Sequence, residues 1–492
     1  MTLAPVMTDP AASVRPAPRA GSRAVPVSSL VVFLALAATL LAAADPLLND
    51  PDSQWHVAVG RWIVDHRTLP WTDLFSHTFA GRPWIAKEWA SQVIFAGAHG
   101  GAGWWGVAVV AIVSTGVALA VMHGWLRARV GPMAALVGVV LAFVVLAPHL
   151  LARPHIFTLP VIVAWTIGLV GARERGLAPP LWLALAMTAW ANLHGSYPIG
   201  LVLAGLIACE GVVDGPRALW RGRAAAWGLF LAASAAAALA TPYGIRPLLV
   251  NLTLFGGGGE SLRFIAEWQP IRFDGPGLAA LGACAVALWV LAAEPRANAF
   301  RIGLVLILAA MMVRHSRFMD LFVLVAPFLV AGPAARRFSA LRTAATSLAP
   351  TTGRAWSAVI ALAAVVLVLA ATAAPQPAPT MTPVAALEAA RAKGLTGPVY
   401  NDYDFGGFLI GAGVPTFIDG RADQIFLGGF MNDLHRAVDA ADHAPFDALL
   451  RRHGVTWALV RAQGAEAGHL SALDGWTLLH RDPVAAVYMR DR

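Results

Sequence analysis

The chain has 492 residues, of which 58% are hydrophobic and only 13% are charged. Soluble proteins carry about 25% charged residues, so this chain has too few to cover a soluble surface and is expected to face lipid. Its net charge of +8 comes from Arg residues scattered singly between apolar segments. That pattern is typical of a polytopic membrane protein and excludes a nucleic-acid partner. Cys209 and Cys284 lie inside apolar runs, so neither indicates a disulfide or a metal site.

A transmembrane helix needs about 20 apolar residues, and suitable segments recur along the chain. We predict an α-helical polytopic membrane protein with about eleven spans, at 28–44, 102–123, 132–149, 156–171, 178–193, 197–213, 224–241, 277–293, 302–314, 319–334 and 356–373. Residues 1–27 are then a cytoplasmic tail and 28–373 the membrane domain. The first span also resembles a signal peptide, because Ala42–Ala44 follow its apolar run. The long lead before it favours an uncleaved helix.

Orientation follows from the positive-inside rule. Six alternate connecting segments contain sixteen Arg residues and only four acids; they are 1–28, 124–131, 172–177, 214–223, 294–301 and 335–355. These segments are predicted to be cytoplasmic. The remaining loops, including the first outward loop at 45–101, then lie outside a bacterial plasma membrane, and they carry nearly all of the His, acidic and Gly-Pro motifs. Any chemistry is therefore expected on the outer face.

The end of the chain has a different composition. Residues 374–382 form a Pro-rich linker, and 383–492 are predicted to be a small extracytoplasmic α/β domain. Its expected helices are Val384–Lys393, a segment near 430–440 and Phe446–Arg452. Its expected strands are Pro398–Tyr400, Thr416–Ile418, Val455–Val460, Trp476–His480 and Ala485–Met489.

The first outward loop contains two acids, Asp50 and Asp52, at the start of an amphipathic surface helix with Trp at helical spacing. Either carboxylate could take a proton from an acceptor hydroxyl as a general base. The alternative is that Asp52 only caps the helix. His56 follows on the same helix and could orient an acid or contact a phosphate; otherwise it is an interfacial polar residue. A second surface helix is predicted over Ile85–His99, beginning around Lys87-Glu88-Trp89. The plain alternative for this segment is membrane anchoring by Trp and Lys.

Several cationic or polar residues fall at or near the outer ends of spans, where a guanidinium suits a phosphate group. The candidates for a substrate or lipid phosphate are His56, Arg153, His155, His194, Arg263, Arg314 and Arg317. The alternative for the Arg residues is snorkelling at the membrane edge. Gly256–Gly259 is either a plain linker or a mobile flap over a site.

The predicted α/β domain has two segments dense in acids and Gly, which could contact sugar hydroxyls or an acceptor. Their candidate residues are Asp402, Asp404, Asp419, Arg421 and Asp423. The alternative is that Asn, Asp and Gly only shape turns at strand ends. The chain has no GxGxxG, P-loop, HExxH or CxxC motif, which argues against a nucleotide-driven pump or a zinc hydrolase. No cofactor is indicated with certainty, and the metal requirement is open: a divalent metal is possible.

The layout resembles the GT-C class of integral-membrane glycosyltransferases, which includes the protein O-mannosyltransferases and aminoarabinose transferases. Four phrases resemble an uncharacterised group of bacterial membrane proteins usually placed with that class: Asp50-Pro-Asp-Ser-Gln-Trp-His56, Arg153-Pro-His155, Asn192-Leu-His-Gly195 and Asp419-Gly-Arg-Ala-Asp423. The resemblance implies a polyprenyl-phosphate-linked sugar as donor, a first-loop acid as base and inversion at the anomeric carbon. It also implies that Arg263, Arg314 and Arg317 are candidates for the lipid phosphate. Many relatives carry two adjacent acids, whereas Pro51 separates them here.

The sequence therefore favours a membrane glycosyltransferase acting on the outer face of the plasma membrane, with Asp52 or Asp50 as the general base. Two other classes stay open: a transporter or flippase for envelope glycolipid, and a non-catalytic assembly protein. Inverted repeats and broken helices, which are common in transporters, are not evident in the sequence.

The orientation gives a first prediction. A reporter that is active only in the cytoplasm, fused after Arg492, is expected to be silent in cells, because the sixteen Arg residues place the opposite loops inside. The same reporter fused within 214–223 serves as the positive control. A bright signal from the C-terminal fusion would show that the number of spans is wrong by one.

Overall fold

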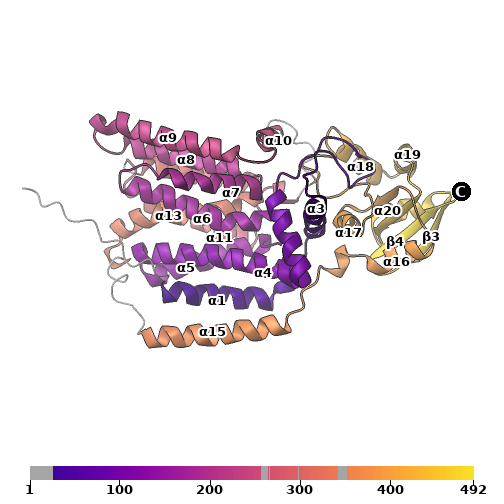
Figure 1. Ribbon diagram of the computed structural model, residues 1–492, viewed down its shortest axis with the longest axis horizontal. Helices are drawn as coiled ribbons and strands as arrows, with labels where there is room; N and C mark the ends of the chain where they lie inside the picture. Colours follow the sequence, from indigo (N-terminus) through magenta and orange to yellow (C-terminus); the bar gives the residue numbers. More distant parts are fainter. Residues whose placement is uncertain (1–25, 256–263, 265, 297, 342–351, 492) are drawn as a thin grey trace, which may run out of the picture.

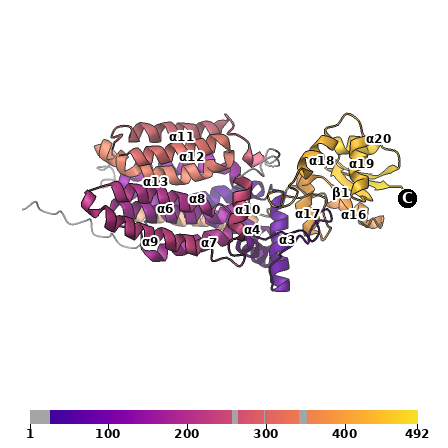
Figure 2. The same ribbon diagram turned by 90° about the horizontal axis from the view of Figure 1, so that it is seen from above.

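The computed structural model describes residues 26–255, 264, 266–296, 298–341 and 352–491. Roughly parallel and antiparallel helices form a bundle at one end of the molecule, and a small sheet with flanking helices lies at the other end (Figures 1 and 2). The surface helix α3 (Asp52–His66) and the first part of α4 (Trp89–Val130) lie between these two parts. Arg263 and Gly256–Gly259 lie outside the described residues.

A helix coincides with each of the predicted spans. Besides α4, these helices are α1 (Val27–Ala42), α5 (Pro132–Leu146), α6 (Thr158–Glu174), α7 (Leu185–Leu193), α8 (Tyr197–Val213), α9 (Trp220–Ala238), α11 (Gly275–Leu291), α12 (Ala299–Arg314), α13 (Met319–Arg337) and α15 (Thr352–Thr372). By length and composition, 5 helices of the described residues can cross a membrane: Trp89–Val130, Pro132–His149, Pro154–Glu174, Ser316–Arg337 and Gly353–Thr372. Shorter apolar helices, including α1, α8 and α11, pack beside them.

The predicted second surface helix begins at Trp89, within the start expected around Lys87-Glu88-Trp89. It continues into the following span as the single helix α4, which is broken at Gly103, where φ is 61°. Glycine adopts this left-handed conformation without steric cost, so the chain can turn from the membrane surface into the bundle there. The remaining short helices of this region are α2 (Ala44–Leu47) and α10 (Arg246–Phe255).

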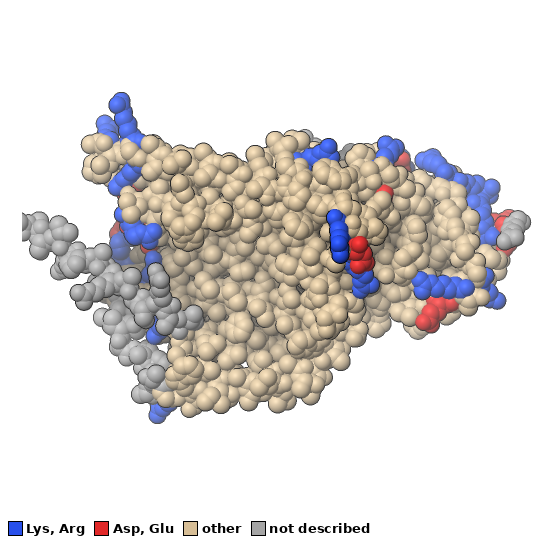
Figure 3. Space-filling model, in the orientation of Figure 1, with Lys and Arg blue, Asp and Glu red and all other residues tan. Residues whose placement is uncertain are grey.

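The surface of the bundle matches a lipid environment. On the face shown in Figure 3, Lys, Arg, Asp and Glu lie at the far end of the bundle, near the middle of the molecule and on the C-terminal part. The broad band of the bundle between the first two places shows only other residues. Buried charges at one end of the bundle are paired: Glu210 accepts from Arg301 at 2.8 Å and from Arg173 at 2.8 Å. These ion pairs join α6, α8 and α12, and pairing offsets the cost of burying the charges.

The C-terminal part contains a 4-stranded sheet of order β1-β2-β4-β3. Its strands are β1 (Val399–Asn401), β2 (Trp457–Arg461), β3 (Trp476–Arg481) and β4 (Ala485–Arg490). β1 and β2 are parallel, while β4 is antiparallel to both of its neighbours. The helices are α16 (Val384–Ala392), α17 (Gly406–Gly411), α18 (Phe430–Val438), α19 (Ala444–Arg452) and α20 (Ala465–Ala472). The predicted strands at 398–400, 455–460, 476–480 and 485–489 coincide with these four strands.

The predicted strand Thr416–Ile418 is not part of this sheet. Thr416 instead forms an isolated bridge with Ser76 of the first outward loop, and the Thr416 amide donates to the Phe75 carbonyl at 3.0 Å. The predicted strand is therefore wrong beyond this single bridge, and the partner of Thr416 comes from a segment about 340 residues away, which no local pattern could reveal.

The first outward loop and the C-terminal part share one hydrophobic core. Trp55, Val59 and Trp84 from the loop belong to the same buried cluster as Tyr400 and Phe417. Burying large aromatic surfaces against each other is a strong stabilising contribution, of roughly 1.5–3 kcal/mol for each side chain. The loop is therefore fixed between the bundle and the C-terminal part, which brings its acids close to residues from both.

Candidate active site

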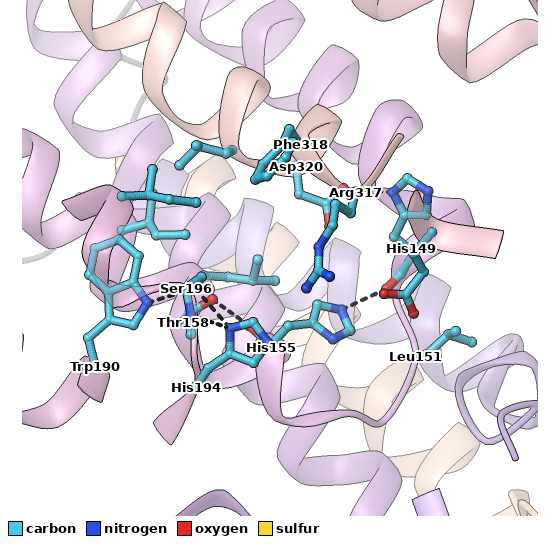
Figure 4. Close-up of a pocket in the computed structure, with 15 residues that line it drawn as sticks. His149, Leu151, His155, Thr158, Trp190, His194, Ser196, Arg317, Phe318 and Asp320 are labelled. Carbon is cyan, nitrogen blue, oxygen red and sulfur yellow. Dashed lines mark hydrogen bonds and ion pairs between the residues drawn. The ribbon is translucent and has the colours of Figure 1, made fainter. Parts of the chain in front are cut away.

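A cavity of about 750 Å³ lies where the bundle, the first outward loop and the C-terminal part meet. Its walls include Asp52 and His56 of α3, Arg153, Arg317 and Tyr403. A smaller cavity of about 120 Å³ lies next to it and extends between the ends of α6, α7, α8 and α13 (Figure 4). The two cavities share wall residues, namely Arg317, His149 and Glu267, and therefore adjoin each other.

Asp50 and Asp52 have different roles at the start of α3. Asp50 is 1% exposed, and its Oδ1 accepts a hydrogen bond of 2.9 Å from the Asp52 amide. The helix is preceded by Pro51, and no side chain caps it at that position. The hypothesis that Asp52 acts only as an N-cap is therefore wrong: Asp52 is the first helical residue, and Asp50 satisfies its amide. This leaves the Asp52 carboxylate free to face the cavity.

Arg153 is the cation beside both acids. Its Nε and Nη2 atoms donate to the two carboxylate oxygens of Asp50, the second at 2.7 Å. Its Nη2 lies 3.2 Å from Asp52 Oδ2, and its Nη1 donates to Glu267. A planar guanidinium can hold a carboxylate through two parallel hydrogen bonds, which fixes Asp50 much more firmly than Asp52.

Asp52 is held at the cavity wall in an environment that disfavours its charge. Burial raises its pKa to about 7, and the neighbouring charge of Asp50 acts in the same direction, while Arg153 opposes both. Trp55 Nε1 donates to Asp52 Oδ1 at 3.0 Å, which stabilises the ionised form. A carboxylate poised near neutral pH can both accept and release a proton, as general acid–base chemistry requires.

Polar side chains line one part of the smaller cavity, and apolar side chains from α6, α8 and α13 line the rest. Figure 4 shows the Arg317 guanidinium pointing into this space towards His155. His149 Nδ1 lies 2.8 Å from Asp320 Oδ1, and His194 Nδ1 lies 2.8 Å from Ser196 Oγ. The smaller cavity thus has an apolar part and a polar part that includes the cation of Arg317.

Arg317 differs from Arg153 in its partners. Its guanidinium carbon lies 4.5 Å from the centre of the Trp268 ring. Within the described part of the chain it forms no ion pair and donates no hydrogen bond. A half-buried guanidinium with unfilled donors provides a site for an anionic group.

Lys87 and Glu88 also belong to the cavity wall. Lys87 pairs with Asp423, and Glu88 Oε1 lies 3.4 Å from His194 Nε2. Burial raises the pKa of Glu88, and burial followed by the charge of Arg317 lowers that of His194. The segment that the sequence offered as a membrane anchor thus contributes Lys87 and Glu88 to the cavity wall.

Most of the predicted site residues converge. The larger cavity is lined by Asp52, His56, Arg153, Arg317, Asp404, Arg421 and Asp423, and the smaller one by His155, His194 and Arg317. Asp50 is buried behind Arg153. Arg314, at the end of α12, is exposed and lines neither cavity.

The acids of the C-terminal part are held mainly by Arg residues. Asp402 lies 3.4 Å from Arg461, which also pairs with Asp404. Arg421 donates to both oxygens of Asp419 at 2.7 Å and also pairs with Asp73 of the first outward loop. Asp419 and Arg421 are almost completely buried, so they fix the loop to the C-terminal part, and neither extends freely towards a sugar.

Several residues of the cavities were not assigned to the site from the sequence, among them His149, Glu88 and Tyr403. His149 follows a proline at the outer end of an apolar span, and this position was the only available signal. Tyr403 and Glu88 are far apart in sequence and come together only through the fold.

Within the described ranges, no group of three or more His, Cys, Asp or Glu residues is arranged to hold a metal ion. The carboxylates of Asp50, Asp52 and Glu267 instead converge on the guanidinium of Arg153.

No protein-family model and no curated protein sequence matches the chain. Among solved structures, an oligosaccharyltransferase from Archaeoglobus fulgidus tethered to an acceptor peptide aligns over 95% of this chain and 74% of its own, with 14% identity and a TM-score of 0.56. The same organism's AglB, in complex with an inhibitory peptide and a dolichol-phosphate, aligns over 89% and 69%, with 12% identity and a TM-score of 0.56. The chain has a GT-C fold.

ArnT from Cupriavidus metallidurans bound to undecaprenyl phosphate also matches, over 94% of this chain and 98% of its own, with 16% identity and a TM-score of 0.47. At such low identities the likeness concerns the fold alone. The sequence-based assignment to the GT-C class is confirmed at that level, and the chemistry of this GT-C chain has to be argued from its own site.

The different environments of the two acids can be tested by stability. Asp50→Asn is expected to lower the free energy of unfolding by about 1.5–3 kcal/mol, because it removes charged hydrogen bonds to Arg153. Asp52→Asn is expected to preserve or raise stability at neutral pH, because it removes a buried carboxylate that has a raised pKa. Thermal unfolding of the purified full chain in detergent measures both. Equal losses for the two variants would contradict these separate roles.

Proposed function

We propose that this protein is a glycosyltransferase that moves a sugar from a polyprenyl phosphate to an acceptor hydroxyl on the outer face of a bacterial plasma membrane. The observation that carries the proposal is the pair of adjoining cavities. A carboxylate with a pKa near 7 lies on one wall, and a guanidinium with no ion pair among the described residues lies at the entrance to an apolar space. The dolichol-phosphate in the AglB complex is consistent with a lipid phosphate as ligand.

The lipid phosphate is assigned to the Arg317 end of the smaller cavity. Apolar residues such as Leu159 and Phe318 line its walls and suit a prenyl chain. Arg317 has free donors for phosphate oxygens, and His149 and His155 lie beside it. A phosphate leaving group gains negative charge as the sugar departs, so a guanidinium here stabilises the transition state more than the ground state.

Asp52 is assigned as the general base, in preference to Asp50. Asp50 has both oxygens held by Arg153 and is shielded from the cavity, whereas Asp52 lines it. The Asp52 carboxylate takes the proton of the acceptor hydroxyl while that oxygen forms a bond to the anomeric carbon. The bond from the anomeric carbon to the phosphate oxygen breaks, and its electron pair leaves with the polyprenyl phosphate. Attack opposite the leaving group inverts the anomeric centre.

The proposal extends to the placement of the chain in the membrane. All eleven predicted spans cross the bilayer, the N-terminal tail is cytoplasmic, and the segment 383–492 is an extracytoplasmic α/β domain. The distribution of Arg supports this orientation. Asp404 and Asp423 on the cavity wall are then placed to contact the sugar or the acceptor.

The lipid-phosphate site gives a binding prediction. Arg317→Ala is expected to weaken the binding of undecaprenyl phosphate to the purified full chain by about 1.5–3 kcal/mol, the contribution of a charged hydrogen bond. Native mass spectrometry or a fluorescence competition assay measures it. Arg314→Ala is the matched control, because Arg314, at the end of α12, is close to Arg317 in sequence but lines neither cavity. If both variants bind undecaprenyl phosphate with the same affinity, the assignment of the lipid phosphate to Arg317 is wrong.

The general base gives a catalytic prediction. Asp52→Asn is expected to slow sugar transfer by about 10²–10⁴, the usual contribution of general acid–base catalysis. The assay offers the full chain a panel of polyprenyl-phosphate sugars and measures the release of polyprenyl phosphate. The parental rate should rise with pH through about 7, because the base must lose its proton. If Asp52→Asn transfers sugar as fast as the parental protein, this mechanism is excluded, and a transporter or an assembly protein is favoured.

A further inference from the structure

The turn at Asp419–Arg421 touches the proposed base through a glycine. A Cβ atom built on Gly420 would lie 1.7 Å from Asp52 Oδ1 and 2.9 Å from Trp55 Nε1. Contacts below 3.0 Å are essentially absent between real Cβ atoms and their neighbours. Only glycine therefore allows the backbone of this turn to lie directly against the Asp52 carboxylate.

A second glycine, Gly407, makes a similar contact with the residue before Asp52. A Cβ on Gly407, at the start of α17, would lie 1.9 Å from the carbonyl oxygen of Pro51. The segment Pro51–Trp55 thus meets bare backbone of the C-terminal part at two points. This contact covers one side of the Asp52 carboxylate, while Arg153 and the cavity lie on its other sides.

The turn that carries Gly420 is itself firmly fixed. Arg421 donates to both Asp419 oxygens, and the Asp419 Oδ2 atom also accepts from Thr416 Oγ1 at 2.7 Å. Arg421 reaches across to Asp73 in the first outward loop. Because every one of these charges is buried and paired, the turn has little freedom to move relative to α3.

We propose that Gly420 and Trp55 are positioning residues for Asp52: the glycine turn excludes water from one side of the carboxylate, and the indole N–H holds one oxygen in place. This inference rests on the proposed function, because it concerns the same base. It assigns to the buried Asp419-Gly420-Arg421 turn a role in the reaction, although both of its side chains, Asp419 and Arg421, are occupied by ion pairs. The C-terminal part is then a wall of the active site and not only an appended binding module.

The test compares Gly420→Ala with Gly468→Ala in the full chain. Gly468 lies in α20 of the same part, and a Cβ there meets nothing within 4 Å, so this control adds the same methyl group without a clash. Gly420→Ala is expected to lower kcat by about 10²-fold, the effect of displacing a reacting group by about 1 Å. Binding of undecaprenyl phosphate is expected to be unchanged, because Arg317 lies elsewhere on the cavity wall.

The pH profile separates positioning from a general effect on folding. The methyl group of Gly420→Ala separates the turn from Asp52 and admits water, so the acidic limb of kcat is expected to move to lower pH. Trp55→Phe keeps an aromatic ring but removes the hydrogen bond to the ionised carboxylate of Asp52. The acidic limb of its kcat–pH profile is therefore expected to move to higher pH. Opposite shifts in the two variants are not expected from a loss of folded protein.

Two outcomes would overturn the inference. One is a parental kcat and pH profile for Gly420→Ala when Asp52→Asn does slow transfer. The other is a loss in Gly420→Ala that is equally large in the Asp52→Asn background, because positioning residues act only through the group they position. If Gly420→Ala does not accumulate in membranes, the test relies on Trp55→Phe. An unshifted acidic limb of the kcat–pH profile of Trp55→Phe then rejects the inference. Failure of the proposed function itself is seen separately, as full activity in Asp52→Asn alone.

Discussion

The arrangement of the candidate site depends on the guanidinium of Arg153. It binds Asp50 through two hydrogen bonds, lies beside Asp52, and also pairs with Glu267. These carboxylates come from the first outward loop and from the segment before α11. One buried cation thus joins several parts of the chain, and three acids close together are tolerable only because that cation balances part of their charge. The unequal sharing keeps Asp50 fixed and leaves Asp52 available for chemistry.

A second constraint is the shared core between the first outward loop and the C-terminal part. Trp55, Trp84 and Phe417 pack in one buried cluster, and Arg421 links Asp419 to Asp73 beside it. The active-site wall is therefore built by segments about 350 residues apart. Such packing gives Asp52 a desolvated environment that α3 alone, as an amphipathic surface helix, could not provide.

The two cavities combine properties that neither has alone. The smaller one offers apolar walls with an unpaired guanidinium at Arg317, and the larger one offers polar walls around Asp52. A substrate with an apolar tail, a phosphate and a polar head matches this order along the space. In the fold, the segment 45–101 lies between the ends of the bundle helices and the C-terminal part, where the two cavities meet.

The helical architecture, the GT-C resemblance, the clustering of acids and histidines in alternate connecting segments, and the candidates Asp50, Asp52, Arg153 and Arg317 were all apparent from the sequence. Apolar length and charge are local properties, so a single sequence reveals them. Only the tertiary structure decided that Asp50 is fixed while Asp52 faces the cavity, that Thr416 pairs with the first loop, and that Asp419 and Arg421 are buried. Those outcomes depend on contacts between distant segments, where burial and partner choice, and not residue type, set the role of each side chain.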